Sequence, residues 1–94
     1  MNFTISGIIP AYNAESTLKE VIIALKAQTV SLGEIIVVDD GSNDMSAEIA
    51  SNCDCKLIKN PIIQGRGSAR NIGVKNTNAE LILFCDSSNL IPPD

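Results

Sequence analysis

Short apolar runs and segments of helical periodicity alternate along this chain. The apolar runs are rich in Ile, Val and Leu and are bounded by turn residues, which predicts strands. Between them, apolar residues recur at spacings of three and four, as on one face of a helix. The predicted strands are residues 3–9, 34–38, 55–58 and 81–85, and the predicted helices are about 14–28, a short helix that carries Ala47, Ile49 and Ala50, and about 67–76.

Polar and small residues indicate how the predicted helices begin and pack. Asn13 is the predicted N-cap of the first helix, because its side chain can accept a hydrogen bond from an unpaired N–H of the first turn. Asp44 or Ser46 is predicted to cap the second helix. The third helix has a face of small residues that includes Ala69 and Gly73, so we expect it to approach the sheet closely.

The order of the elements predicts the fold class. Strands that alternate with helices form a parallel sheet with right-handed crossovers, so the chain is predicted to be α/β with a mostly parallel sheet. Lysines flank the apolar pair in residues 55–58, which places this strand at a sheet edge. Pro10 is predicted to end the first strand, because proline has no N–H to donate. A chain of 94 residues is enough for one small domain.

Polar side chains follow three of the predicted strands. Tyr12 follows the first strand, Asp39 and Asp40 the second, and Asp86 the fourth. The carboxyl ends of parallel strands meet at one rim, where ligands bind in open α/β sheets. An Asp-Gly pair after a strand is by itself typical of a turn that leads into a helix. The polar residues at the other strand ends favour a binding site instead.

The composition excludes several classes of function. The chain has no histidine, which rules out Ser-His-Asp and Cys-His catalysis and histidine-ligated zinc. A metal would therefore be held by oxygen, which suggests Mg²⁺ or Mn²⁺. The net charge of −4 and the aromatic content of 3% argue against a nucleic-acid partner, which requires basic patches and stacking side chains.

The cysteines and the first residues bear on the compartment. Cys53, Cys55 and Cys85 form neither a disulfide framework nor a four-ligand zinc motif, so we interpret them as reduced thiols, with Cys85 in the core. The first four residues lack the basic and apolar segments of a signal peptide, and no apolar run reaches transmembrane length. We therefore expect a cytoplasmic protein.

Four motifs follow one another along the chain: Pro10-Ala11-Tyr12-Asn13, Val37-Val38-Asp39-Asp40-Gly41-Ser42-x-Asp44, Gly67-x-Ala69-Arg70-Asn71-x-Gly73 and Leu83-Phe84-Cys85-Asp86-Ser87-Ser88. With this order and spacing, the chain resembles family 2 glycosyltransferases over essentially its whole length. The resemblance implies the GT-A fold, whose amino-terminal half is a three-layer, Rossmann-like β/α sandwich. It also implies transfer of a sugar from a nucleotide-sugar, often UDP-linked, to a saccharide or lipid acceptor.

The resemblance further implies which residues contact the nucleotide. The carboxylate of Asp40, with Asp39 beside it or anchoring the turn, would accept hydrogen bonds from base N–H groups and ribose hydroxyls. Arg70 would contact phosphate or a ribose-facing carboxylate, whereas Arg66 is predicted to be an ordinary solvated charge. The predicted nucleotide contacts are Pro10, Tyr12, Glu15, Asp39, Asp40, Arg70 and Asp86.

Asp86 also begins the Asp-x-Asp motif that holds a divalent metal against two phosphates in this family. Ser88 stands where the second acid of the motif is expected, and Asn89 stands where another acid is common. Both offer only neutral oxygens, whereas Mg²⁺ is usually held by one or two carboxylates together with substrate phosphates. We predict a Mn²⁺ or Mg²⁺ site at Asp86 and Ser88 with reduced affinity.

In the family, the acceptor pocket and the catalytic base lie in the second half of a longer chain. Residues 1–94 are therefore predicted to be a single nucleotide-sugar-binding domain, a fragment that cannot transfer sugar alone and could reach a membrane only through further regions. The alternative is an inactive relative that serves as a nucleotide-binding or interaction module. A signalling receiver domain is discounted, because no Asp follows the predicted strand at 55–58.

Overall fold

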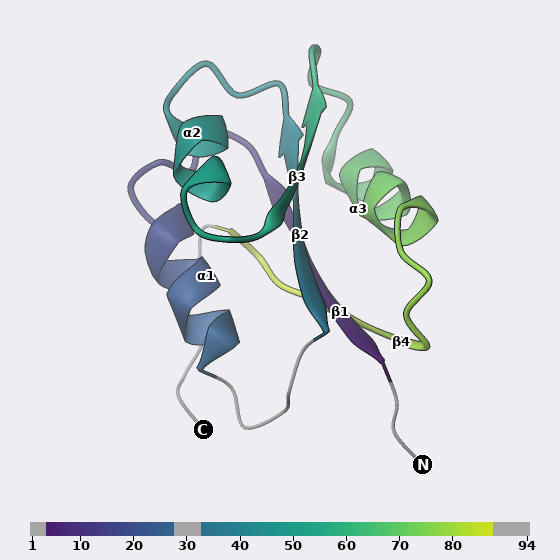
Figure 1. Cartoon of the computed structure of the whole chain (residues 1–94). Coiled ribbons are helices and arrows are strands. Elements are labelled where there is room, and N and C mark those ends of the chain that lie inside the picture. Colours follow the sequence, from purple (N-terminus) through teal and green to yellow (C-terminus); the bar gives the residue numbers. More distant parts are fainter. Residues whose placement is uncertain (1–3, 28–32, 88–94) are drawn as a thin grey trace.

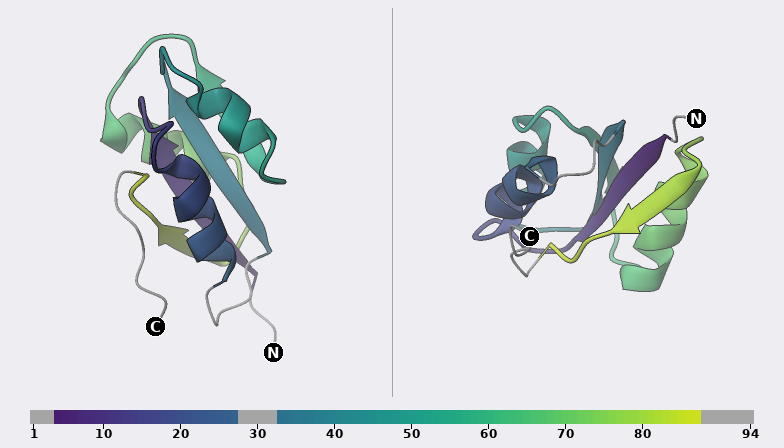
Figure 2. Two further views of the ribbon diagram at one scale, coloured as in Figure 1. Left: turned by 90° about the vertical axis from the view of Figure 1, so that its left-hand side faces the viewer. Right: turned by 90° about the horizontal axis from the view of Figure 1, so that it is seen from below.

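A four-stranded parallel sheet forms the middle layer of the protein. The computed structural model describes residues 4–27 and 33–87. The strands lie in the order β3-β2-β1-β4, with α1 and α2 on one face and α3 on the other (Figure 1, Figure 2). This arrangement confirms the predicted three-layer α/β sandwich. The elements are β1 (Ile5–Ala11), α1 (Leu18–Lys26), β2 (Glu34–Asp40), α2 (Ser46–Ser51), β3 (Lys56–Asn60), α3 (Arg66–Lys75) and β4 (Leu81–Phe84).

β1 lies in the centre of the sheet and continues past Pro10, which corrects the prediction that this proline ends the strand. Pro10 and Ala11 lie opposite Val38 and Asp39 of β2. β4 pairs with β1 only as far as Ile8. Beyond that residue β1 therefore has a partner strand on one side alone, so the missing N–H of proline is tolerated there.

α1 begins later than its sequence pattern predicts. The prediction of Asn13 as N-cap is wrong, because the helix begins at Leu18 and is preceded by Thr17. The intervening residues form a tight turn, in which the N–H groups of Thr17 and Leu18 both donate to the carbonyl oxygen of Ala14. Asn13 has a φ of 48°, a left-handed conformation that Asn tolerates better than most residues.

Each face of the sheet carries its own apolar cluster. On the α1 and α2 side, Leu18, Val21, Ile22 and Leu25 pack with buried residues of β1 and β2. On the other side Ala69 of α3 packs against Ile8, Ile36 and Val38. A Cβ added to Gly73 of α3 would lie 2.5 Å from Cγ2 of Ile8. The small face of α3 therefore brings this helix close to β1, as the sequence predicted.

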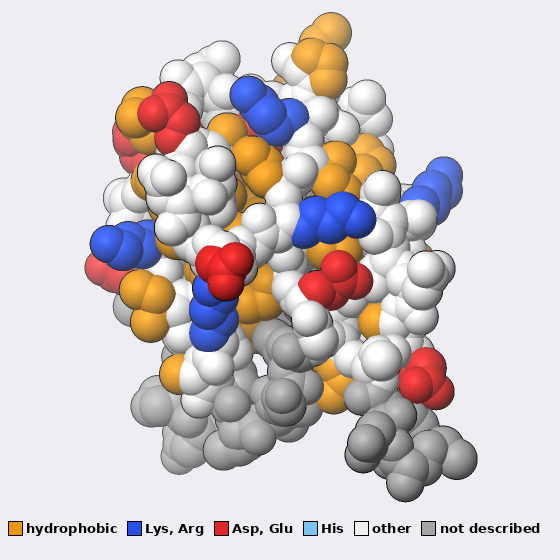
Figure 3. Space-filling model, in the orientation of Figure 1, with side chains coloured by type: hydrophobic (Ala, Val, Ile, Leu, Met, Phe, Trp, Pro, Cys, Tyr) orange, Lys and Arg blue, Asp and Glu red, His pale blue; other side chains and the backbone are white. Residues whose placement is uncertain are grey.

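The two edge strands of the sheet differ in their exposed side chains. β3 lies at an edge, as predicted, and its exposed Lys56 and Lys59 disfavour pairing with another strand. β4 forms the opposite edge, and its Leu81, Leu83 and Phe84 are exposed although the apolar sequence is typical of a buried strand. On the face shown in Figure 3, Lys and Arg side chains are interspersed with Asp and Glu side chains.

Among the residues that the structure describes, no helix is both long enough and apolar enough to span a bilayer.

The contact between α3 and β1 predicts the effect of adding one methyl group. We expect Gly73→Ala to lower the free energy of unfolding by about 1–3 kcal/mol, because its Cβ would press on the fully buried Ile8. Gly67→Ala in the same helix is the matched control. A Cβ there meets no atom within 4 Å, so its stability should be unchanged or higher by about 0.5–1 kcal/mol. Urea unfolding of both variants measures the difference, and equal stabilities would contradict the prediction.

Candidate functional site

A cavity of about 270 Å³ opens at the carboxyl ends of β1 and β2, beside the start of α3. Its wall combines residues from β1 and the loop after it, from β2, from the first turn of α3 with the loop before it, and from the segment after β4. These residues are Pro10, Ala11, Tyr12, Asp40, Ile63, Gly65, Arg66, Ala69, Asp86 and Ser87. The fold thus brings four of the predicted nucleotide contacts to one cavity, namely Pro10, Tyr12, Asp40 and Asp86.

Asp40 joins the end of β2 to the loop before α3. Its Oδ1 accepts hydrogen bonds from Asn60 Nδ2 (3.1 Å) and the N–H of Gln64 (3.0 Å), and its Oδ2 accepts one from the N–H of Gly65 (2.9 Å). Burial raises the pKa of this carboxyl, but the three hydrogen bonds outweigh burial and hold the pKa below its ordinary value. Asp40 is therefore a stable anion that fixes the loop over the cavity.

Gly41 allows the same loop to approach β2. It has a φ of +76°, and a Cβ at this position would lie 2.6 Å from the backbone nitrogen of Ile63. Any other residue would both strain the backbone and collide with the chain opposite. Asp40 thus holds residues 64 and 65 by hydrogen bonds, and Gly41 allows residue 63 to lie close to the end of β2.

Asp39 lies on the other side of the sheet from Asp40. Both acids are the last residues of β2 instead of lying past its end, and successive side chains of a strand point to opposite faces. Asp39 is 3% exposed, and its Oδ1 has no hydrogen-bond partner among the described residues. It is not part of the cavity wall. A buried carboxylate oxygen without a donor costs free energy.

The loop after β2 holds the turn that follows β1. Three successive backbone N–H groups, those of residues 13, 14 and 15, each donate to a side chain of this loop or of the first residue of α2: Ser42 Oγ (2.9 Å), Ser46 Oγ (2.9 Å) and Asp44 Oδ2 (3.1 Å). Asp44 Oδ1 also accepts from the N–H of Ser46, the first residue of α2, although the N-cap residue of this helix is Met45 and not Asp44 or Ser46 as predicted. Burial raises the pKa of Asp44, but its hydrogen bonds outweigh burial and hold the pKa below the ordinary value. The Gly-Ser-x-Asp motif therefore shapes the wall at Tyr12.

Besides Asp39, two further predicted contacts lie outside the cavity wall. The guanidinium of Arg70 lies over the ring of Phe84, 5.4 Å from its centroid. Glu15 is exposed, and its backbone N–H is bonded to Asp44. Neither side chain is brought to the cavity in this structure.

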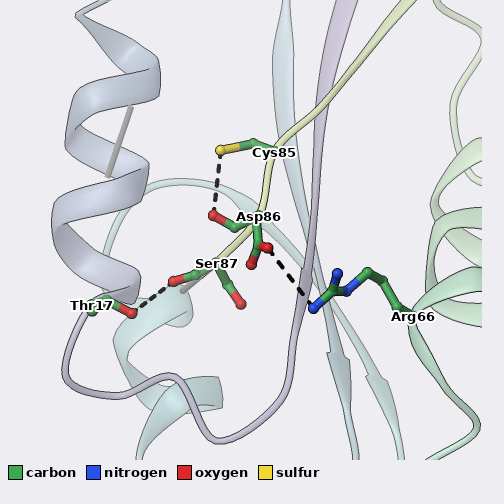
Figure 4. Close-up of polar contacts among 5 residues, drawn as sticks. All are labelled: Thr17, Arg66, Cys85, Asp86 and Ser87. Atoms are coloured by element: carbon green, nitrogen blue, oxygen red, sulfur yellow. Dashed lines mark hydrogen bonds and ion pairs between the residues drawn. The ribbon is translucent and has the colours of Figure 1, made fainter. Parts of the chain in front are cut away.

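Arg66, which the sequence left as a solvated charge, does line the cavity. Its Nη2 lies 3.8 Å from Oδ2 of Asp86, and Figure 4 shows the two side chains reaching toward each other. The residue types gave no signal for this pair, because 20 positions separate the two residues and only the fold brings them together. Gly65, which precedes Arg66, has a φ of +106° and turns the chain into α3.

The segment after β4 is fixed at both ends. The N–H of Cys85 donates to the carbonyl oxygen of Ile8 (3.0 Å), and Thr17 Oγ1 donates to the carbonyl oxygen of Ser87 (2.7 Å) (Figure 4). Cys85 is buried, as predicted. Burial and the neighbouring Asp86 raise the pKa of its thiol, so it stays protonated and is a core residue. Asp86 is thus held at a defined place in the cavity wall.

A divalent metal at the cavity would depend on Asp86. The described residues contain no group of three or more Asp, Glu, Cys or His side chains that could enclose an ion. Asp40 already accepts three hydrogen bonds, whereas the side chain of Asp86 is 32% exposed. Asp86 can supply the one carboxylate that Mg²⁺ or Mn²⁺ needs alongside phosphate oxygens. Ser88, the other predicted ligand, lies outside the described residues.

The sequence model of glycosyl transferase family 2 matches residues 6–94. The chain therefore belongs to glycosyl transferase family 2, as its four motifs predicted.

Relatives and solved structures agree with this assignment. An uncharacterized glycosyltransferase of Haemophilus influenzae is 40% identical over 95 residues, which cover 96% of this chain and 38% of the relative. The crystal structure of S. aureus TarS in complex with UDP-GlcNAc matches with a TM-score of 0.85 and 30% identity, over 96% of this chain and 28% of that one. Glucosyl-3-phosphoglycerate synthase from Mycobacterium tuberculosis, in complex with Mn²⁺, UDP and glucosyl-3-phosphoglycerate, matches with a TM-score of 0.80 and 28% identity, over 92% of this chain and 34% of that one. The likeness confirms the GT-A fold, and the chain spans less than two fifths of each of these proteins.

The hydrogen bonds of Asp40 predict a pH-dependent contribution to stability. A carboxyl with a lowered pKa stabilises the fold above its unfolded pKa, near pH 4, and this stabilisation disappears as the pH falls through the folded pKa. We expect Asp40→Asn to lower the free energy of unfolding by about 1–3 kcal/mol at pH 7, because its amide would face the N–H of Gly65 or Gln64. The difference from wild type should shrink below about pH 4. Urea unfolding at several pH values measures it, with the exposed Asp54→Asn as control; a difference independent of pH would contradict this account.

Proposed function

We propose that the cavity at the carboxyl ends of β1 and β2 binds the nucleotide of a nucleotide-sugar donor, with UDP the favoured nucleotide. The observation that carries this proposal is the convergence of Pro10, Tyr12, Asp40 and Asp86 on one cavity in a family 2 chain. Two proteins of the same fold, at 28–30% identity, are described in complex with UDP or a UDP-sugar. Support for UDP over other nucleotides comes from these relatives.

The nucleoside would be read by Asp40, the acid of the β2 pair that lines the cavity. Asp39 lies on the opposite face of β2, so its proposed part in nucleotide binding is indirect, in anchoring the turn that follows the strand. Asp40 has about four acceptor positions and uses three, which leaves one for a ribose hydroxyl. Tyr12 and Pro10 would pack against the base and ribose.

Glu15 and Arg70 remain proposed contacts of a more distant part of the donor. Both side chains are exposed, so neither would need to leave a buried site. Arg70 would have to leave the ring of Phe84, a contact that contributes about 0.5–1 kcal/mol at an exposed site.

A divalent metal is proposed to bind beside Asp86, with Ser88 as a neutral ligand. A bound ion would neutralise the diphosphate as it leaves the sugar. Mn²⁺ accompanies UDP in the mycobacterial synthase described above.

In the whole protein, we propose that this domain presents the donor for glycosyl transfer to a saccharide or lipid acceptor in the cytoplasm. The residues that deprotonate the acceptor would lie outside residues 1–94, so this chain alone should bind the donor without sustained turnover. Glycosylation of an acceptor by the 94-residue chain would overturn that part of the proposal.

Nucleotide binding can be measured directly by isothermal titration calorimetry. We expect the 94-residue chain to bind UDP, and to bind it more tightly with Mn²⁺ than with EDTA. GDP should bind more weakly, because a purine presents different N–H groups to Asp40. If no nucleotide binds with or without Mn²⁺, the chain is better described as an interaction module that keeps the fold alone.

A further inference from the structure

The cation in the wall of the cavity is Arg66, and not the arginine that the family motif indicates. Among the lining residues it is the one with a positively charged side chain. Arg70 lies one helical turn further along α3, over Phe84, and does not contribute to the wall. The two arginines on one helix are therefore divided between the cavity and the exposed ring of an edge strand.

We propose that Arg66 binds the diphosphate of the donor, and that this contact gives the cavity an affinity for UDP that needs no divalent metal. The inference rests on the proposed donor site and adds to it a residue that determines how the diphosphate is held. A guanidinium presents five N–H donors in a planar fork, which matches two phosphate oxygens at once.

The charges around the cavity call for such a cation. Asp40 and Asp86 both line it, and a diphosphate brings further negative charge to the same space. Coulomb repulsion between like charges at a few ångströms opposes binding unless a positive charge lies between them. Arg66 lies 3.8 Å from Asp86 and can contact this carboxylate and a phosphate oxygen together.

The pair of Arg66 and Asp86 is poorly explained as a stabilising ion pair. Their side chains are 63% and 32% exposed, and at 3.8 Å the contact is long. Exposed ion pairs contribute about 0–1 kcal/mol to stability. The pair is better explained as a positioning contact, in which Asp86 keeps the flexible arginine over the cavity and lowers the entropy that its ordering by a ligand would cost.

A divalent metal would be a weak substitute for this arginine. Asp40 is engaged by three N–H donors, and Ser88 has no charge in the place of an acid. A metal held mainly through Asp86 would bind less tightly than one between two carboxylates. Arg66 is a covalently attached cation, so its contribution to binding does not depend on metal concentration.

The test uses the 94-residue chain and four proteins: wild type, Arg66→Gln, Arg66→Lys and the control Lys75→Gln. Lys75 lies in the last turn of the same helix and is exposed, so the control removes an equal charge away from the cavity. Each protein is titrated calorimetrically with UDP and with uridine, in EDTA and in Mn²⁺. Urea unfolding confirms that all four are folded.

In EDTA, we expect Arg66→Gln to weaken UDP binding by at least about tenfold and to leave uridine binding unchanged, because uridine has no phosphate. Arg66→Lys should recover part of the loss, since an ammonium supplies the charge without the planar fork. Mn²⁺ should increase UDP affinity by a larger factor in Arg66→Gln than in wild type, because Mn²⁺ then supplies the positive charge that was lost with Arg66.

Three results would overturn the inference, and they differ in what they say about the donor site. If wild type and all variants bind UDP with equal affinity, Arg66 has no role in binding, although the proposed donor site stands. If wild type binds UDP only with Mn²⁺, the site is metal-dependent and Arg66 is not its cation. If neither UDP nor uridine binds in any condition, the proposed donor site itself is wrong.

Discussion

The hydrogen bonds that Asp40 accepts from Gln64 and Gly65 determine where α3 starts relative to the sheet. They join the end of β2 to the loop before α3, and Gly41 leaves the room that this loop needs. Together with the packing of Ala69 against the sheet, they fix the first turn of α3, which carries Arg66, beside β1 and β2. A carboxylate whose pKa is held low is suited to this role, because it remains charged at any pH above about 4.

The loop after β2 extends this constraint to the other wall of the cavity. Ser42, Asp44 and Ser46 each accept an N–H from the turn that carries Tyr12 toward α1. The side chains of the Gly-Ser-x-Asp part of this motif are thus mostly hydrogen-bonded to the protein's own backbone. Loss of binding in a variant of these residues would therefore report a displaced loop, whereas Arg66 lines the cavity with its own side chain.

Several features of the fold followed from sequence alone, and the exceptions have physical causes. The β-branched runs and the helical periodicity predicted every strand and helix to within a few residues, and the flanking lysines predicted the edge position of β3. Pro10 was misjudged because its tolerance depends on how far β4 extends beside β1. Asn13 was misjudged because side chains some 30 residues away satisfy the N–H groups of its turn, so α1 begins only at Leu18.

For the candidate site, the sequence determined the chemistry at the strand ends and the tertiary structure decided which groups meet. Parallel strands must end at one rim, so Tyr12, Asp40 and Asp86 could be predicted to gather there. The alternation of side chains along β2 placed Asp39 and Asp40 on opposite faces and gave them different partners. Whether Arg66 or Arg70 lines the cavity depends on the path of a loop held by Asp40 and on the exposed ring of Phe84. Local sequence carries no information about such long-range contacts, because they arise only when distant segments pack together.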